Sequence, residues 1–209
     1  MRTPTMWDFH APSGLAGFTQ SSCSVALWRR QPRSDFRVLI DCIRGDLAEF
    51  RQLLSPAAVE QSLAAAFPAR FWRSSLARPW LEDVTALVDM FCQESACAQC
   101  CVRLESLRTA AHFHTDSHSL QLVCSYRGPG ISWLGEDNVD FRLTDGWPYR
   151  EEEIVLRPHE VHQANERDVV LLKGRSANTL PVYHKGPSRR PQDLTSWILR
   201  MTPAVPTRR

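Results

Sequence analysis

The chain has 209 residues, of which 43% are hydrophobic and 23% are charged, and its formal net charge is +2. This size and balance are typical of a globular protein with one substantial core. No stretch reaches the roughly 18 apolar residues that a membrane span needs, so we expect no membrane partner. The first residues lack the apolar core of a secretory signal, and an odd number of cysteines suits reduced thiols, so we expect a cytoplasmic protein.

The predicted elements begin after an irregular N-terminal segment over residues 1–23, which is rich in Pro, Gly, Ser and Thr. A short apolar run at residues 24–28, closed by arginines and a proline, predicts a strand. Apolar residues at helical spacing then predict three helices. These helices cover residues 46–54, residues 55–67 with a Ser-Pro start, and residues 80–92.

From Cys101 onward the hydrophobic spacing changes from that of helices to that of strands. Strands are expected at 120–126, before a Gly-Pro-Gly turn, at 169–172, and at 194–199. Helices followed by many short strands predict an α+β fold. We expect N-terminal helices packed on a double-stranded β-helix, which is a jelly-roll or cupin-like core.

This pattern predicts a single α+β jelly-roll-like domain over residues 24–201. We expect the part over 24–95 to be mainly helical and the part over 101–201 to consist mainly of strands. The last residues, 202–209, contain two prolines and two terminal arginines, and we expect them to form a flexible tail.

The most informative run reads H-F-H-T-D-S-H. On an extended strand His114 and Asp116 project to the same side, where one ion could bridge them. A distant third ligand would complete the two-histidine, one-carboxylate set that binds non-haem Fe(II) and leaves coordination positions open. His184 is the candidate for that third metal ligand. His112 and His118 project to the same side, so they are candidates for orienting the ligands or adding one.

Two other interpretations of the histidines exist. An H-x-D triplet arises by chance in a chain with seven histidines, so the run could be the polar surface of a half-buried sheet, with His184 in an ordinary loop. His159 and His162 resemble a metalloprotease helix only superficially. They are three positions apart and directly follow a proline, whereas the H-E-x-x-H zinc motif needs them four apart on a helix.

Four cysteines lie close together in the sequence, at Cys92, Cys97, Cys100 and Cys101. The C-x2-C spacing within them is that of a zinc site, but the second half that makes such patterns specific is lacking. We therefore expect reduced, non-ligating thiols, with metal binding or redox chemistry as the alternatives.

Several short elements occur in a fixed order: A-L-W-R from Ala26, F-H-T-D ending at Asp116, L-V-C-S-Y-R-G-P-G with W-L after it, L-L-K-G ending at Gly174, and H-K-G-P from His184. Together they resemble the bacterial DUF1826 family over residues 24–201. The family has no assigned activity. The resemblance implies a link to metal supply, since the genes of this family accompany those of zinc-responsive regulation and of metal-chaperone GTPases. Its histidine and aspartate elements map onto His114, Asp116 and His184.

The order of helices, H-x-D motif and distal histidine also resembles, more distantly, the Fe(II)/2-oxoglutarate oxygenase superfamily. Such enzymes usually carry an Arg or Lys about ten residues after the distal histidine to pair with a carboxylate of 2-oxoglutarate. This chain has Asp, Leu and Thr there. Arg189, Arg190 or Arg200 could supply the charge instead, because a guanidinium suits a carboxylate wherever the fold places it. Tyr126 and Arg127 are further candidates for cofactor binding.

We therefore expect a mononuclear non-haem Fe(II)-dependent oxygenase-like protein, in one version dependent on 2-oxoglutarate, with a link to metal homeostasis. The alternative is a non-catalytic protein that buffers or hands on Zn(II) through the same residues, since zinc accepts these ligands. A scaffold that has lost its metal is a third interpretation. The basic C-terminal region lacks interleaved aromatic residues, so we expect no nucleic-acid partner. The substrate, a small molecule or a protein, is left open.

Overall fold

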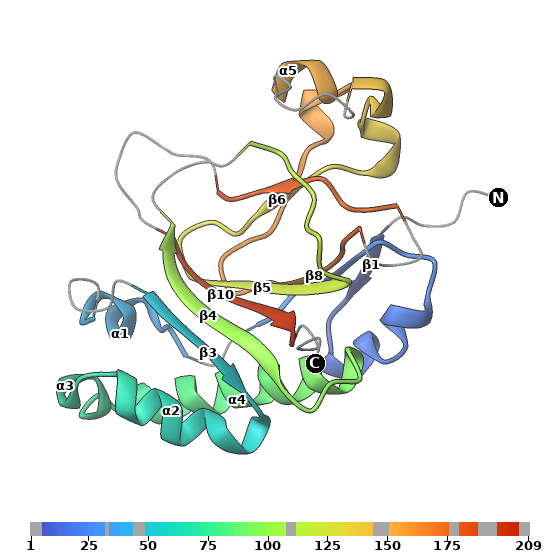
Figure 1. Cartoon of the computed structure of the whole chain (residues 1–209). Helices are drawn as coiled ribbons and strands as arrows, with labels where there is room; N and C mark the ends of the chain where they lie inside the picture. Colours follow the sequence, from blue (N-terminus) through green and yellow to red (C-terminus); the bar gives the residue numbers. More distant parts are fainter. Residues whose placement is uncertain are drawn as a thin grey trace.

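The computed structural model describes residues 6–31, 34–43, 49–107, 112–143, 151–175, 180–187 and 196–204. These segments form two sheets and a group of helices (Figure 1). The large sheet has seven strands in the order β1-β2-β8-β5-β10-β4-β3, and the small sheet has three in the order β7-β6-β9. The fold is α+β, as the sequence predicts.

The strands are β1 (Met6–Phe9), β2 (Val25–Trp28), β3 (Glu49–Leu54), β4 (Cys100–Leu107), β5 (Leu120–Arg127), β6 (Ser132–Trp133), β7 (His162–Gln163), β8 (Val169–Lys173), β9 (His184–Lys185) and β10 (Ser196–Pro203). The α-helices are α1 (Arg37–Asp41), α2 (Val59–Ala66), α3 (Ala69–Trp72), α4 (Ala77–Glu94) and α5 (Glu151–Ile154). Within the described segments, no helix has the length and apolar character that crossing a membrane requires.

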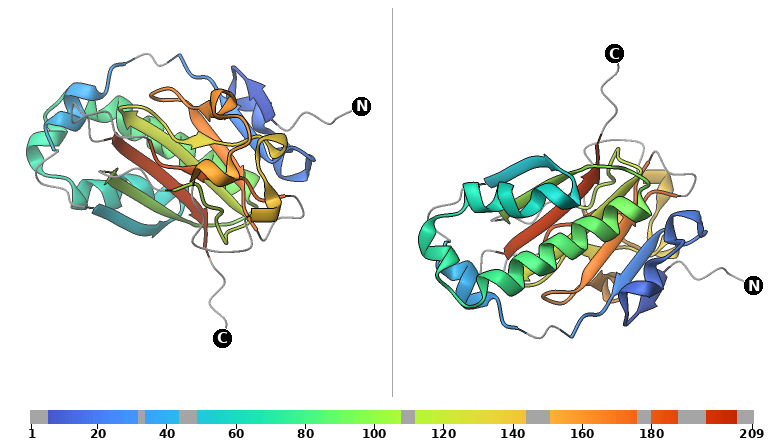
Figure 2. Two further views of the ribbon diagram at one scale, coloured as in Figure 1. Left: turned by 90° about the horizontal axis from the view of Figure 1, so that it is seen from above. Right: turned by 90° about the horizontal axis from the view of Figure 1, so that it is seen from below.

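Helix α4 runs across one face of the large sheet, and α2 and α3 lie on the same side (Figure 2). It is 18 residues long, and its apolar residues recur every three or four positions, so they form one face. Val84, Val88 and Phe91 of this face are buried in one cluster with Leu104 of β4 and Leu199 of β10. This contact between helix and sheet forms the main core.

The opposite face of the large sheet packs against the small sheet. Successive side chains in a strand point to opposite faces, so neighbouring residues of β10 enter different cores. Leu199 packs under the helices, whereas Ile198 packs with Trp133 of β6 and Val123 of β5. Arg200 shares the face of Ile198, and this second face is the one that bears on the candidate site.

Strand β3 lies where the sequence predicts part of a helix over residues 46–54, so that prediction is wrong. β3 pairs with β4, with Phe50 opposite Leu104 and Leu54 opposite Cys100. Phe50 and Leu54 are the buried residues of this strand. A spacing of four positions places two residues on one face of a helix and equally on one face of a strand. Hydrophobic spacing therefore did not separate the two structures.

The N-terminal segment over residues 1–23 is not wholly irregular, because Met6–Phe9 forms strand β1. This strand pairs in parallel with β2, and Phe9 stacks on Trp28 with ring centroids 6.3 Å apart. Contacts with a partner distant in sequence hold it in place, and local composition does not report such contacts. At the other end, β10 extends to Pro203, so the tail predicted over 202–209 begins within a strand.

A buried polar network joins α4 to the large sheet. Arg30 donates hydrogen bonds to both carboxylate oxygens of Asp83 on α4, at 2.5 and 3.1 Å, and the Tyr126 hydroxyl donates to the same carboxylate at 2.5 Å. The Arg30 side chain is only 7% exposed. Burial raises the pKa of the Tyr126 hydroxyl well above its usual value, so the hydroxyl stays a donor. The network thus places the positive charge of Arg30, neutralised by Asp83, next to the main core.

We expect Asp83→Ala to lower the free energy of unfolding by about 3 kcal/mol, because it leaves the buried Arg30 charge without its partner. Urea denaturation followed by circular dichroism measures this. The control is Arg78→Ala on the same helix, whose ion pairs with Glu60 and Glu82 lie at the surface and should contribute little. Equal losses in both variants would contradict a structural role for the buried network.

Candidate metal centre

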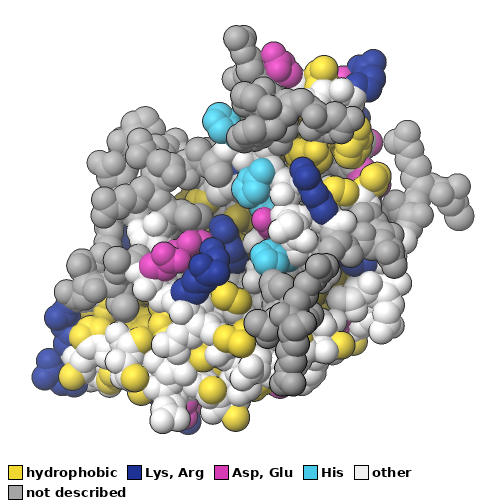
Figure 3. Space-filling model, in the orientation of Figure 1, with side chains coloured by type: hydrophobic (Ala, Val, Ile, Leu, Met, Phe, Trp, Pro, Cys, Tyr) yellow, Lys and Arg dark blue, Asp and Glu magenta, His cyan; other side chains and the backbone are white. Residues whose placement is uncertain are grey.

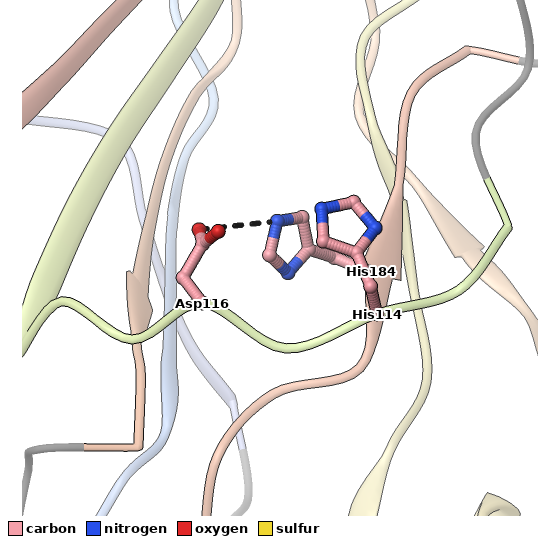
Figure 4. A group of neighbouring side chains, drawn as sticks. All are labelled: His114, Asp116 and His184. Atoms are coloured by element: carbon pink, nitrogen blue, oxygen red, sulfur yellow. Dashed lines mark ion pairs between the residues drawn. The ribbon is translucent and has the colours of Figure 1, made fainter. Parts of the chain in front are cut away.

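His114, Asp116 and His184 lie together in the structure (Figure 4). Each offers one ligand atom, and the three atoms lie within 4.8 Å of one another. His184 begins strand β9 of the small sheet, whereas His114 and Asp116 belong to the segment between β4 and β5. The fold thus brings together the three residues that the sequence singles out.

A backbone bridge joins two of these residues. The His114 N–H donates to the His184 carbonyl and the His184 N–H donates to the His114 carbonyl, both at 2.9 Å. The two side chains therefore project from directly opposite positions, and their ring centroids are 4.6 Å apart. The H-x-D run is a loop with one bridge, and the regular strand that its alternation predicts is not formed.

Both imidazole rings are held in an orientation that leaves Nε2 available. Nδ1 of His114 lies 2.9 Å from the His112 carbonyl oxygen, and Nδ1 of His184 lies 3.1 Å from the Val182 carbonyl oxygen. A carbonyl oxygen only accepts, so we assign the proton to Nδ1 in both rings, which makes each Nε2 an acceptor. Histidines that bind metals are commonly oriented by such a bond from the other ring nitrogen.

The Asp116 carboxylate faces these rings. Its Oδ2 is buried without a hydrogen-bond partner among the described residues, and His184 Nε2 lies 3.4 Å away. Burial by itself raises the pKa of this carboxyl, but the contact with His184, the charges that His184 and His114 carry when protonated, and the charge of Arg200 hold it below its usual value. Burial and the charge of His184 lower the pKa of His114. A carboxylate and a neutral ring are the forms that metals bind.

Gly174, directly after β8, allows the Asp116 segment to approach. A Cβ at this position would lie 2.0 Å from the backbone oxygen of His118 and 2.8 Å from that of Asp116. Arg175 fixes the same segment, because its N–H donates to the Asp116 carbonyl at 2.8 Å and its side chain donates to the Thr115 hydroxyl at 2.6 Å. The glycine of the L-K-G element therefore helps to position Asp116, a role that the sequence analysis did not identify.

Tyr126 and Arg127, two candidates for cofactor binding, are engaged on the helix side of the large sheet. The Tyr126 hydroxyl is bound to Asp83, and Arg127 forms an ion pair with Asp41 of α1 at 2.9 Å. Their assignment to cofactor binding stays a prediction, and the alternation of strand faces, which directs Tyr126 away from the histidines, argues against it for Tyr126. Arg190, a third candidate, lies outside the described residues.

Arg200 is the cofactor candidate that lies on the face of the site. Its positive charge lowers the pKa of both His114 and Asp116. Its Nε is buried without a hydrogen-bond partner among the described residues, and one of its terminal nitrogens lies 3.4 Å from Glu105 on the neighbouring strand β4. The sequence analysis missed Glu105, since only the register between β4 and β10 brings it to Arg200.

The other histidines that the sequence analysis considered supply no ligand atom to the cluster. His112 contributes through its backbone carbonyl, and its side chain is exposed. His118 is half-buried, and its backbone oxygen is the atom closest to Gly174. His159 and His162 are exposed and do not belong to the cluster.

Three of the four neighbouring cysteines gather at the end of α4. Cys92 is electrostatically linked to Cys97 and is in contact with Cys100, and burial raises the pKa of Cys92 to about 11. Cys92 and Cys100 belong to the core under the helices, with Cys97 packed against it. Cys101 follows Cys100 on β4, so its side chain points to the other face. The three thiols thus lie on the opposite side of the sheet from Arg200.

The donor set suits a divalent transition metal. Two imidazole nitrogens and one carboxylate oxygen form the facial set that iron uses in oxygenases, and zinc accepts the same ligands. Oδ2 of Asp116, which lacks a hydrogen-bond partner among the described residues, is a buried polar atom that a cation would satisfy. The residues present therefore fit a metal ion.

Comparisons with known proteins name a family. The family model described as a protein of unknown function, DUF1826, matches residues 10–201. No curated protein matches the chain. A crystal structure of a candidate oxygenase from Shewanella oneidensis is similar with a TM-score of 0.46 and 9% identity, covering 94% of this chain and 88% of that chain. At this score the similarity carries no argument about function.

We expect each of His114→Ala, Asp116→Ala and His184→Ala to abolish stoichiometric binding of a divalent metal, because two ligands from this set hold an ion poorly. Elemental analysis after anaerobic loading measures the metal content. His159→Ala and His162→Ala serve as controls and should bind metal as the unchanged protein does. Retention of metal by the His184 variant would argue against the site.

Replacing Cys97 and Cys100 together with Ser should leave this metal in place, because these thiols lie on the other side of the large sheet. The same elemental analysis, carried out with zinc, provides the measurement. If half or more of the zinc left with the two thiols, the cysteines would form a metal site of their own.

Proposed function

Because the chain belongs to the DUF1826 family, whose description assigns no activity, we propose its function from the site: a mononuclear non-haem Fe(II)-dependent oxygenase-like protein. The observation that carries the proposal is the meeting of two histidines and a buried carboxylate within 4.8 Å. Both rings are oriented by backbone carbonyls, and the carboxylate has an oxygen without a partner among the described residues.

We infer that the scaffold is a double-stranded β-helix. Strands β8-β5-β10-β4 are consecutive in the large sheet, and the small sheet is β7-β6-β9. The bridge between His114 and His184 adds the H-x-D segment beside β9 as a further short strand position. Two facing sheets with four strand positions each are the arrangement of a jelly roll. The buried cluster shared by Val123, Ile198 and Trp133 supports this inference, since it joins the two sheets.

The roles of the residues follow from their geometry. Bound Fe(II) would supply the activation of dioxygen, with electrons from an organic co-substrate. His114, Asp116 and His184 would hold one face of the ion and leave the other positions open. Phe113 and Tyr183, the neighbours of the two histidines in sequence, are buried in one apolar cluster, so they keep water from that side.

Arg200 is our candidate partner for the far carboxylate of 2-oxoglutarate. It lies on β10, the strand that follows His184, and its charge acts on the two ligands of the H-x-D run. Its buried Nε lacks a partner among the described residues. A carboxylate buried without a cationic partner would cost several kcal/mol, so such a partner is a requirement of the co-substrate.

Glu105 favours the alternative function, a zinc-handling protein. Its carboxylate already lies 3.4 Å from Arg200, where it reduces the charge available to a co-substrate. Zinc would be held by the same His/Asp/His set without any co-substrate. In this version the link to metal homeostasis, with a metal-chaperone GTPase as partner, is the function.

The test adds 2-oxoglutarate to the Fe(II)-loaded protein without oxygen. We expect a weak visible charge-transfer band, because the keto acid would take two of the open positions. Arg200→Gln should raise the Kd for 2-oxoglutarate about tenfold or more, the loss of a charged hydrogen bond. The control is Arg29→Gln, whose ion pair with Asp8 is exposed. Absence of the band and of co-substrate-dependent oxygen uptake, with tight Zn(II) binding, would favour the alternative.

A further inference from the structure

Three arginines form a row across three neighbouring strands of the large sheet. Arg51 of β3 is directly opposite Arg103 of β4, and Arg103 is directly opposite Arg200 of β10. Residues opposite each other in an antiparallel pair lie on the same face with Cβ atoms about 5 Å apart. The row therefore begins at Arg200 and runs away from the candidate metal centre toward the edge strand β3. We call Arg51, Arg103 and Arg200 the arginine row.

This arrangement is unfavourable for stability. Like charges directly opposite each other destabilise a sheet, and Glu49 and Glu105, which are opposite each other, relieve this only in part through diagonal contacts longer than the direct Arg–Arg contacts. Glu105 forms an ion pair with Arg200. Among the described residues neither Arg51 nor Arg103 has an ion-pair partner. Protection of a sheet edge by charge could account for Arg51, but Arg103 lies on an interior strand.

The outer end of the arginine row is more exposed to solvent than the end near the site. Arg51 is exposed, Arg103 is half-buried, and the Arg200 side chain is 23% exposed. Arg200, the inner end of the row, is opposite Val123, whose side chain packs toward the small sheet that carries His184, and the charge of Arg200 lowers the pKa of His114 and of Asp116. On the side of the molecule drawn in the space-filling view, histidine and acidic side chains lie together near the centre, with basic and acidic side chains beside them (Figure 3).

We propose that the outer part of the arginine row, Arg51 and Arg103, binds a phosphate or carboxylate group of the substrate. The proposal rests on the proposed function for the reaction, and it adds the substrate class: an anionic organic molecule. With Arg200 assigned to the co-substrate, Arg103 and Arg51 lie one and two strands farther out, about 5 and 10 Å away. A substrate anion held there would lie alongside the metal centre with its neutral part free to reach it.

The chemistry of the face argues against a nucleic-acid partner. The described residues on this face of β3 and β4 are Glu49, Arg51, Leu53, Cys101, Arg103 and Glu105, which include no aromatic ring. Binding of single-stranded nucleic acid relies on aromatic side chains that stack on bases, and none is present among the described residues on this face of the two strands, since Phe50 of β3 points to the helix side. A guanidinium pair instead suits the oxygens of one phosphate or carboxylate.

The test measures binding of inorganic pyrophosphate to the metal-free full chain by isothermal titration calorimetry at low ionic strength. We expect binding whose Kd rises about tenfold in Arg103→Gln and about threefold in the more exposed Arg51→Gln. Arg103→Lys should recover part of the loss, since it restores the charge. The control is Arg78→Gln, an exposed arginine on α4, which should bind as the unchanged protein does.

Three results would overturn the proposal. They are a lack of pyrophosphate binding by the unchanged protein, binding by both Arg51→Gln and Arg103→Gln as tight as that of the unchanged protein, and a loss of affinity in Arg78→Gln as large as in these two variants. If Arg103→Gln failed to fold by thermal melting, Arg51→Gln on the edge strand would decide alone. The charge-transfer band with 2-oxoglutarate should persist in Arg51→Gln and Arg103→Gln. Loss of pyrophosphate binding with the band intact separates the substrate site from the proposed reaction, and pyrophosphate binding without any band would refute only the oxygenase.

Discussion

The backbone bridge between His114 and His184 is the contact on which the candidate site depends. Its two hydrogen bonds involve no side-chain atom, so they form whether or not an ion is bound. They tie the loop that carries Asp116 to strand β9, and β9 is paired to β6 through Trp133 opposite His184. Two ligand rings are thereby placed before any metal arrives. Such preorganisation lowers the ordering cost of binding and is what a precise metal site needs.

The candidate ligands, which the structure brings together, could be singled out from the sequence because ligand chemistry is a local property of residue type and order. Gly174 and Glu105 could not, since their importance arises from pairing between distant strands, which no local pattern reports. Strand β3 shows the same limit for secondary structure. Phe50 and Leu54 fit both a helix and a strand, and only the pairing of β3 with β4 decides between them.

Because side chains alternate along each strand, the two faces of the large sheet have different roles. Toward the helices, Asp83 gathers Arg30 and Tyr126 into a compensated network that belongs to the core. Toward the small sheet, Arg200 and Glu105 retain polar atoms without hydrogen-bond partners among the described residues. Toward the helices, Nε1 of Trp80 and of Trp197 also lack partners among the described residues, but an open atom of a charged group such as Arg200 costs more free energy, so the face toward the small sheet suits ligand binding better than it suits stability. Tyr126 is bound to Asp83 on the helix side, whereas Arg200 lies on the face toward the small sheet, so of the two Arg200 is the better candidate for cofactor binding.

The pairing of Arg200 with Glu105 weakens the case for a co-substrate only if Arg200 acts alone. A carboxylate arriving at Arg200 would share one guanidinium with Glu105, and the two anions would repel each other. Arg103, directly opposite Arg200, supplies a second positive charge at this point. Arg103 itself is assigned to the substrate anion, so its charge offsets only part of this repulsion, and the like-charge contact within the row is relieved when anions are bound at Arg200 and at Arg103. The feature that costs stability in the free protein is therefore the feature that would favour an anion beside the metal centre.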